Sequence, residues 1–147
     1  MDQVRAYYKV TNDLASSGQP TEEQFSKIAE QGFCVLINLA MPTSDFAIKN
    51  EEAIVNDLGM SYFHIPVPWE TPQVSDVEKF FSLMQSFQNK KVWVHCALNM
   101  RASCFIYLYR SCILRLPELE AKYPMVEIWQ PSGAWQELIA KVKNRTD

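Results

Sequence analysis

A short apolar run leads into a cysteine-containing turn and then into a helical pattern, and this succession constrains the fold more than any other part of the chain. Val92-Trp93-Val94 predicts a strand, Cys96 follows it, and a helical pattern begins at Arg101. Backbone N–H groups at the start of a helix have no acceptor within the helix, so they favour an anion and the thiolate form of a cysteine. We therefore expect an anion-binding turn with Cys96 at its base.

Arg101 adds a planar, permanently charged group that can grip two oxygens of a tetrahedral anion. Asn99 is the turn residue best able to adopt a left-handed conformation. An alternative explanation of the same residues is a small apolar Cys96 on a core strand and an Arg101 on a solvated helix face. The predicted phosphate-binding segment comprises Ala97, Leu98, Asn99, Met100 and Arg101.

Length and charge narrow the classes of function. The chain has 147 residues, of which 48% are hydrophobic, so we expect one domain over residues 1–147. Its net charge of −3 and sequence pI near 5.4 argue against nucleic-acid and membrane partners. No apolar run reaches the roughly 18 residues that span a bilayer, and the first residues are not those of a signal peptide. We expect a cytoplasmic protein and leave open a leader outside this sequence.

The cysteines and histidines indicate neither a disulfide framework nor a metal site. The four cysteines form no CxxC pair, and His64 and His95 have no acidic cluster beside them in the sequence. We expect no metal and no organic cofactor. The cysteines other than Cys96 are interpreted as packing residues, although one near Cys96 could form a reversible disulfide with it. They are Cys34, Cys104 and Cys112.

Strand and helix patterns alternate along the chain. They predict an α/β fold with a mainly parallel central sheet flanked by helices, in which ligands bind beyond the carboxyl ends of strands. Residues 15–20 are expected to break the first strand. The expected strands are 7–11, 33–39, 61–67 and 92–94, and the expected helices are 21–32, 50–58, one from about 75, 101–114, one from 117 interrupted at Pro124, and a last one across 135–142.

Two helix starts carry a capping signature. Thr21 with Gln24 predicts a reciprocal capping box, and Gly32 predicts the end of that helix. Ser75 with Glu78 predicts a second box.

With these elements in order, the chain resembles the cysteine-dependent phosphatase superfamily, specifically small bacterial proteins related to tyrosine and dual-specificity phosphatases. The resemblance covers most of the chain, and its strongest part is Val94-His95-Cys96 followed by an arginine that opens a helix. The other segments are Ser17-Gly18-Gln19-Pro20, Val35-Leu36-Ile37-Asn38-Leu39, Leu58-Gly59-Met60 and Tyr62-Phe63-His64-Ile65-Pro66-Val67.

The resemblance implies a hydrolase that cleaves a phosphomonoester, in a protein or a small molecule, through a phospho-cysteine on Cys96. Arg101 would hold the phosphate oxygens, and an acid from the loop after residues 66–67 would protonate the leaving oxygen. Glu70 is the first candidate for this acid and Asp76 the second, with Trp69 as a lip over the substrate. The interpretation of Glu70 as a solvated loop charge remains equally open.

The turn departs from the family pattern in three ways. Four residues rather than five separate Cys96 from Arg101, no glycine is present, and Ala102 stands where a hydroxyl residue usually follows the arginine. Ser103 supplies a hydroxyl one position later. His95 either shapes the turn by hydrogen bonding or is a strand-end histidine satisfied by the backbone.

Two other functions stay open at this point. A spacing of four residues is found in rhodanese-like sulfurtransferases, which would carry a persulfide on Cys96 and make no use of Glu70. Alternatively, the turn could bind phosphate, sulfate or a phosphorylated partner without turnover.

Overall fold

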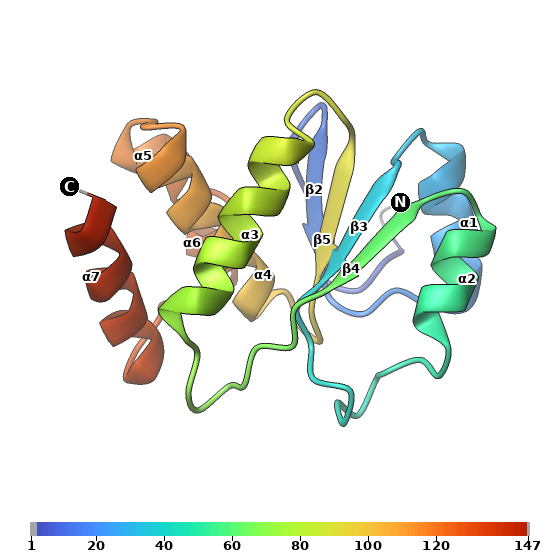
Figure 1. Cartoon of the computed structure of the whole chain (residues 1–147), viewed down its shortest axis with the longest axis horizontal. Helices are drawn as coiled ribbons and strands as arrows, with labels where there is room; N and C mark the ends of the chain where they lie inside the picture. The colour runs from blue at the N-terminus through green and yellow to red at the C-terminus, as the bar shows by residue number, and fades with distance from the viewer. Residues whose placement is uncertain (1–2, 147) are drawn as a thin grey trace.

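The computed structural model describes residues 3–146, and its centre is a five-stranded sheet with the order β1-β2-β5-β3-β4 (Figure 1). β1 pairs antiparallel with β2, whereas the β2–β5, β5–β3 and β3–β4 pairs are parallel. The expected α/β fold with a mainly parallel sheet is therefore confirmed. The strands are β1 (Tyr8–Thr11), β2 (Leu14–Ser17), β3 (Val35–Asn38), β4 (Ser61–His64) and β5 (Val92–His95).

The prediction that residues 15–20 break the chain before the first helix is wrong for residues 15–17, which belong to β2. All four residues of β2 are buried, because the strand lies between β1 and β5. The segment is rich in small and polar residues, so its sequence resembles a turn, but pairing satisfies its backbone. The hydroxyl of Ser17 also accepts a hydrogen bond from Trp93 Nε1 at 2.8 Å.

Helices cover both faces of the sheet. In Figure 1, α1 and α2 lie on one side and α3, α4 and the later helices on the other. This arrangement leaves β5, the middle strand, covered on both faces, and all four of its residues are buried. The helices are α1 (Glu22–Glu30), α2 (Glu51–Asp57), α3 (Val74–Ser86), α4 (Met100–Leu108), the π-helical turn η1 (Tyr109–Ile113), α5 (Glu118–Ala121), α6 (Met125–Ile128) and α7 (Ala134–Thr146).

The side chains of β5 alternate between two hydrophobic clusters. Val92 and Val94 pack with α3, α4 and α7, whereas Trp93 packs with α1, α2 and the N-terminal segment. Tyr7 stacks on Trp93 with ring centroids 5.3 Å apart. A period of two along a strand places alternate residues on opposite faces, so both clusters anchor the strand that delivers Cys96.

The first capping box is confirmed and the second is not. Thr21 Oγ1 accepts from the Gln24 amide, Gln24 Oε1 accepts from the Thr21 amide, and Gly32 has a φ of 93° just past the helix.

In place of the predicted box of Ser75 with Glu78, Gln73 and Asp76 form the box at the start of α3. The Gln73 amide donates to Asp76 Oδ2 at 3.3 Å, so the helix begins at Val74. Asp76, the second candidate acid, therefore has a structural role at the start of α3.

The helix after Arg101 is buried almost all round, as its sequence predicts, and it continues into η1. The break at Pro124 separates α5 from α6. Within residues 3–146, none of the helices combines the length and the apolar character that crossing a lipid bilayer would require.

The packing between α3 and α4 gives a first prediction. Phe80 on α3 has no exposed surface and contacts the rings of Phe105 and Tyr109. Phe80→Ala is expected to lower the free energy of unfolding by about 3–5 kcal/mol in urea denaturation, because it removes the buried ring and leaves a cavity. Lys79→Ala, at an exposed position of the same helix, should change it by less than about 0.5 kcal/mol. Equal effects of the two substitutions would contradict the described core.

Candidate active site

The segment Cys96 to Arg101 connects the carboxyl end of β5 to the start of α4. The backbone curls so that the Ala102 amide, in the first turn of α4, lies 3.4 Å from Cys96 Sγ and donates to it. Cys96 has no exposed surface, so a reactant reaches the sulfur only when the covering residues move. The sulfur thus lies at the positive end of a nine-residue helix, which favours a thiolate.

Asn99 makes the turn possible. Its φ of 68° lies in the left-handed region, which confirms the predicted use of this residue in a loop without glycine. Its side-chain amide donates to the Ala6 carbonyl at 2.8 Å and to Ser16 Oγ at 3.1 Å. These bonds tie the turn to the N-terminal segment and to β2.

The remaining loop amides are available to a ligand. No backbone hydrogen bond found in the turns and loops of residues 3–146 uses the amides of Ala97, Leu98, Met100 or Arg101 as donors. The Ala97 carbonyl is directed elsewhere, since it accepts from the Gln19 amide at 3.0 Å. Unpaired N–H groups near a helix N-terminus suit an anion.

Arg101 is held in place through one edge of its guanidinium. Its Nε donates to the Val67 carbonyl at 2.8 Å, and its Cζ lies 5.3 Å from the centroid of the Trp69 ring. The two terminal nitrogens make no hydrogen bond within residues 3–146, so they can bind two oxygens of an anion.

His95 forms a buried ion pair directly behind the cysteine. Its Nε2 lies 2.7 Å from Glu51 Oε2, and its Nδ1 lies 3.2 Å from the Cys96 carbonyl oxygen. Hydrogen bonds at both ring nitrogens fix the orientation of the imidazole. His95 is therefore bonded both to the backbone beside Cys96 and to a carboxylate at the start of α2.

Glu51 is the counter-charge. Burial acts to raise the pKa of Glu51, but hydrogen bonding and attraction from His95, with a 2.7 Å hydrogen bond from Gln19 Nε2, outweigh burial and hold that pKa below its usual value. Breaking a buried pair of this kind by removing one partner is strongly destabilising, because it leaves the other charge uncompensated.

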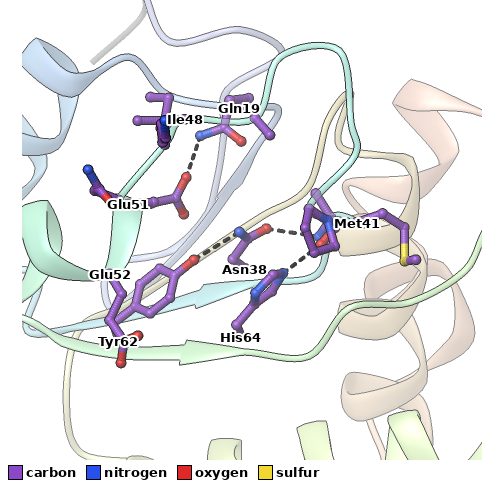
Figure 2. A pocket seen from close by; sticks show the side chains of 13 residues that line it. Gln19, Asn38, Met41, Ile48, Glu51, Glu52, Tyr62 and His64 are labelled. Atoms are coloured by element: carbon purple, nitrogen blue, oxygen red, sulfur yellow. Dashed lines mark hydrogen bonds between the residues drawn. The ribbon is translucent and has the colours of Figure 1, made fainter.

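A cavity of about 570 Å³ lies at the carboxyl ends of β3 and β4 (Figure 2). Residues 96–101 do not line it; its link to them is through Gln19, whose amide donates to the Ala97 carbonyl, and Glu51, which pairs with His95. Gln19 and Glu51 line it on one side, and Asn38, Tyr62 and His64 line the other. Hydrogen bonds hold these side chains in place. Asn38 donates to the Tyr62 hydroxyl at 3.0 Å, and His64 Nε2 lies 2.6 Å from the Ala40 carbonyl oxygen. The cavity therefore offers polar walls at the same edge of the sheet as the Cys96 loop.

The other predicted site residues, Trp69 and Glu70, lie on the loop after β4. Trp69 forms a cluster with Trp129 and Trp135, with centroids 5.3–5.4 Å from its own, and reaches Arg101 as described above. Glu70 is exposed and lines a hollow between the start of α3 and α7, and no hydrogen bond within residues 3–146 fixes its carboxylate. The structure thus brings Trp69 to Arg101 and leaves Glu70 on the outer side of the loop.

Ser103 does not contact Cys96 in this structure. Its hydroxyl donates to the Met100 carbonyl at 3.1 Å and accepts from Trp129 Nε1 at 3.2 Å. Trp129 in turn packs on Trp69. Ser103 therefore links the start of α4 to the tryptophan cluster.

The four cysteines are free thiols. Cys104 and Cys112 are buried in the core with Cys96, and Cys34 is half-buried with its sulfur 3.8 Å from the Lys91 carbonyl. Complete burial raises the pKa of the Cys104 thiol, which suits a packing residue rather than a nucleophile.

Glu51 was not identified as a site residue from the sequence, and Gln19 was named only as part of a segment that resembles the family. Glu51 is 44 residues from His95 and looks like an ordinary acidic residue in the first turn of a helix. The signal available was a pair of unexplained polar residues, Gln19 after a strand and Glu51 at a helix start, at the same edge of a parallel sheet.

Fold and loop together define a class of protein. An α/β fold with a cysteine at the carboxyl end of a central parallel strand, below a helix that begins with an arginine-containing anion loop, is that of the cysteine-dependent phosphatases. The model of the family described as "DSP-PTPase phosphatase fused to NAD+ Kinase" matches residues 2–139, and the chain belongs to this family. The resemblance seen in the sequence is thereby confirmed. A search of the curated proteins gives no match.

Solved structures agree with this assignment. The chain is 37% identical to a DUF442 phosphatase candidate from Shewanella putrefaciens CN-32, with a TM-score of 0.88 over 99% of this chain and 95% of that chain. Tk-PTP in its active form is 17% identical, with a TM-score of 0.80 over 95% and 97%. PTPMT1 in complex with PI(5)P is 11% identical, with a TM-score of 0.79 over 95% and 96%. The last two likenesses show the fold alone.

The buried Glu51–His95 pair predicts a specific pH dependence of stability. A carboxylate whose pKa is lowered on folding contributes stability that is complete above its unfolded pKa and is lost as the pH falls through its folded pKa. Glu51→Gln should lower the free energy of unfolding by about 3 kcal/mol at pH 7, and the deficit should shrink as the pH falls below about 4.

Glu52→Gln is the matched control, because Glu52 is exposed on the same helix. Urea unfolding at a series of pH values measures both variants. A deficit for Glu51→Gln that does not change with pH would contradict the charged pair.

Proposed function

We propose that the chain hydrolyses a phosphomonoester through a covalent phospho-cysteine on Cys96. The single observation that carries this proposal is the placement of Cys96 Sγ under the Ala102 amide, at the N-terminus of α4. The amides of Ala97, Leu98, Met100 and Arg101 donate to no backbone acceptor in the turns and loops of residues 3–146. A thiolate held in an anion cradle is a nucleophile beside the binding site for its own target.

In the first step the thiolate of Cys96 attacks phosphorus, so that the S–P bond forms while the P–O bond to the leaving group breaks. His95, hydrogen bonded to Glu51 and to the Cys96 carbonyl, fixes the backbone that carries the nucleophile. The leaving oxygen takes a proton from an acid, for which Glu70 is the proposed group. In the second step, water attacks phosphorus and passes a proton to the Glu70 carboxylate, the S–P bond breaks, and phosphate and the thiolate are released.

Arg101 and the loop amides stabilise the charge on the transferred phosphoryl group. The Val67 and Trp69 contacts orient the guanidinium before a substrate binds, so little reorganisation is needed in the transition state. Trp69 also links Arg101 to the loop that carries Glu70. A movement of this loop would deliver Glu70 to the leaving group and uncover the buried sulfur.

The substrate is proposed to be a phosphorylated protein side chain or a small phosphate ester. PTPMT1, which shares the fold, binds PI(5)P in its structure, and the cavity of about 570 Å³ at the same edge of the sheet as the Cys96 loop can accept a leaving group with hydroxyl groups. Its Asn38 and Tyr62 side chains supply polar contacts of the kind that such a group needs.

Hydrolysis of phenyl phosphate tests the proposal directly. We expect phenolate release by the wild type and a loss of at least about 10³-fold in kcat for Cys96→Ser, because the nucleophile is removed. Arg101→Lys should lower kcat by about 10²-fold, because a point charge replaces a bidentate hydrogen-bond donor. Cys112→Ser, a buried cysteine of η1 outside the loop, is the matched control and should keep the activity of the wild type.

The same samples separate the other functions. Phosphate binding without phenolate release would contradict hydrolysis and favour a binding module. Cys96-dependent formation of thiocyanate from thiosulfate and cyanide, without phenolate release, would favour a sulfurtransferase.

The role of Glu70 is tested by varying the leaving group. Glu70→Gln is expected to lower kcat by about 10²-fold for phenyl phosphate, whose leaving group is basic and needs a proton. For nitrophenyl phosphate, whose leaving group is far less basic, the loss should be much smaller. Asp76→Asn is the control: it should weaken the cap of α3 by about 1 kcal/mol and show no dependence on the leaving group. A uniform loss for Glu70→Gln across both substrates would contradict its role as an acid.

A further inference from the structure

Arg5 lies against the Cys96 loop, although it is 91 positions away from Cys96 in the sequence. Its carbonyl accepts from the Gly18 amide at 2.7 Å. A Cβ atom placed on Gly18 would lie 3.1 Å from Arg5 Cγ and Cδ, and 2.5 Å from the Ala97 carbonyl oxygen. The Arg5 side chain and the first carbonyl of the loop therefore flank the same point, and residue 18 has to be glycine for both to be there.

A second segment orients the guanidinium. Arg5 Cζ lies 3.8 Å from the centroid of the Phe46 ring, and Phe46 belongs to the segment between β3 and α2. That segment lies at the carboxyl edge of the sheet, where β5 delivers Cys96. Stacking covers one face of the guanidinium and leaves its N–H edges free. Phe46 is 40% exposed, so the stacked pair is on the surface.

The donors of Arg5 are unused. Within residues 3–146 the guanidinium makes no hydrogen bond, and no carboxylate lies within 4.0 Å of it, the neighbouring Asp45 included. In contrast, Arg110 and Arg145 pair with carboxylates, and Arg101 donates to a carbonyl. A positioned guanidinium without an internal acceptor, at the edge of an anion loop, is available to an external anion.

We propose that Arg5, stacked on Phe46, binds a second anionic group of the substrate, a carboxylate or a phosphate next to the phosphate that is cleaved. This inference rests on the proposed function and defines its substrate class more closely. Arg101 and the loop amides bind the scissile phosphate, and Arg5, on the other side of Gly18, binds the second anionic group. On a chain with a net charge of −3, this paired placement of cations selects substrates with a second anionic group over esters that carry the scissile phosphate alone.

The test compares phenyl phosphate with carboxyphenyl phosphate, which adds one carboxylate to the same leaving group. The readout is the ratio of kcat/KM for the carboxylated ester to that for the plain ester. The ratio should exceed about 10 in the wild type, fall about tenfold in Arg5→Gln, mainly through KM, and fall less in Arg5→Lys, which keeps the charge without the planar donor edge. Phe46→Leu should lower the ratio by a smaller factor, because the guanidinium loses its platform.

Lys9→Gln is the matched control. It removes one positive charge from an exposed position of β1 and should leave the ratio of the wild type in place. A ratio near 1 in the wild type, or a ratio that Arg5→Gln does not change, would overturn the inference while the proposed function stands.

Two further pairs of probes distinguish the source of the second anion. One pair is a phosphotyrosine peptide with Asp beside the phosphotyrosine and the same peptide with Asn. The other pair is an alkanediol bisphosphate and its monophosphate. An Arg5-dependent preference in the first pair assigns the anion to an acidic protein segment, and one in the second assigns it to a small bisphosphate. No Arg5-dependent preference in either pair would overturn the inference.

Failure of the proposed function has a separate signature. If the wild type cleaves none of these esters, calorimetric binding of phenyl phosphate and carboxyphenyl phosphate to Cys96→Ser still tests Arg5. Binding of the carboxylated ester that is about tenfold tighter, and that is lost in the Cys96→Ser, Arg5→Gln double variant, supports the second anion site. Equal binding of the two esters would overturn it.

Discussion

The closure of the loop from Cys96 to Ala102 is the interaction on which the rest of the structure depends. One hydrogen bond, from the Ala102 amide to Cys96 Sγ, places a sulfur at the end of a parallel strand and at the start of a helix at the same time. Asn99 supplies the left-handed residue that the short turn requires, and its amide fastens the turn to β2 and to the N-terminal segment. The proposed roles of Cys96 as nucleophile, of the loop amides as anion ligands and of Arg101 as the group that holds the phosphate all depend on this geometry.

The surroundings of the loop balance its charges. His95 lies behind Cys96, and its pairing with Glu51, at the start of α2, lowers the pKa of that carboxyl. On the other side, Val67 and Trp69 hold the guanidinium of Arg101. The cost of burying the Glu51–His95 pair is offset by the hydrogen bonds that satisfy it, and the pair couples the position of α2 to the electrostatics of the sulfur.

Local patterns were predictable from the sequence, and contacts between distant segments were not. The loop, the left-handed Asn99 and the box of Thr21 with Gln24 depend on neighbouring residues, so their patterns were readable. β2 was missed because its residues are not typical of a strand. What makes it a strand is pairing with β1 and β5, which are distant or not yet defined when the sequence is read. The start of α3 was misplaced because two polar pairs, two residues apart, both fit the capping pattern. Glu51 and Arg5 reach the site only through the fold, and no spacing marks them.

Trapping of the covalent intermediate is the most direct test of the central claim. The wild type is mixed with phenyl phosphate and quenched in acid within the first turnover. The protein is then digested, and the mass of the peptide that contains residue 96 is measured by mass spectrometry. The account predicts one phosphoryl group on that peptide, present in the wild type and absent in Cys96→Ser. Phenolate release without a phosphoryl group on Cys96, or release that persists undiminished in Cys96→Ser, would contradict it.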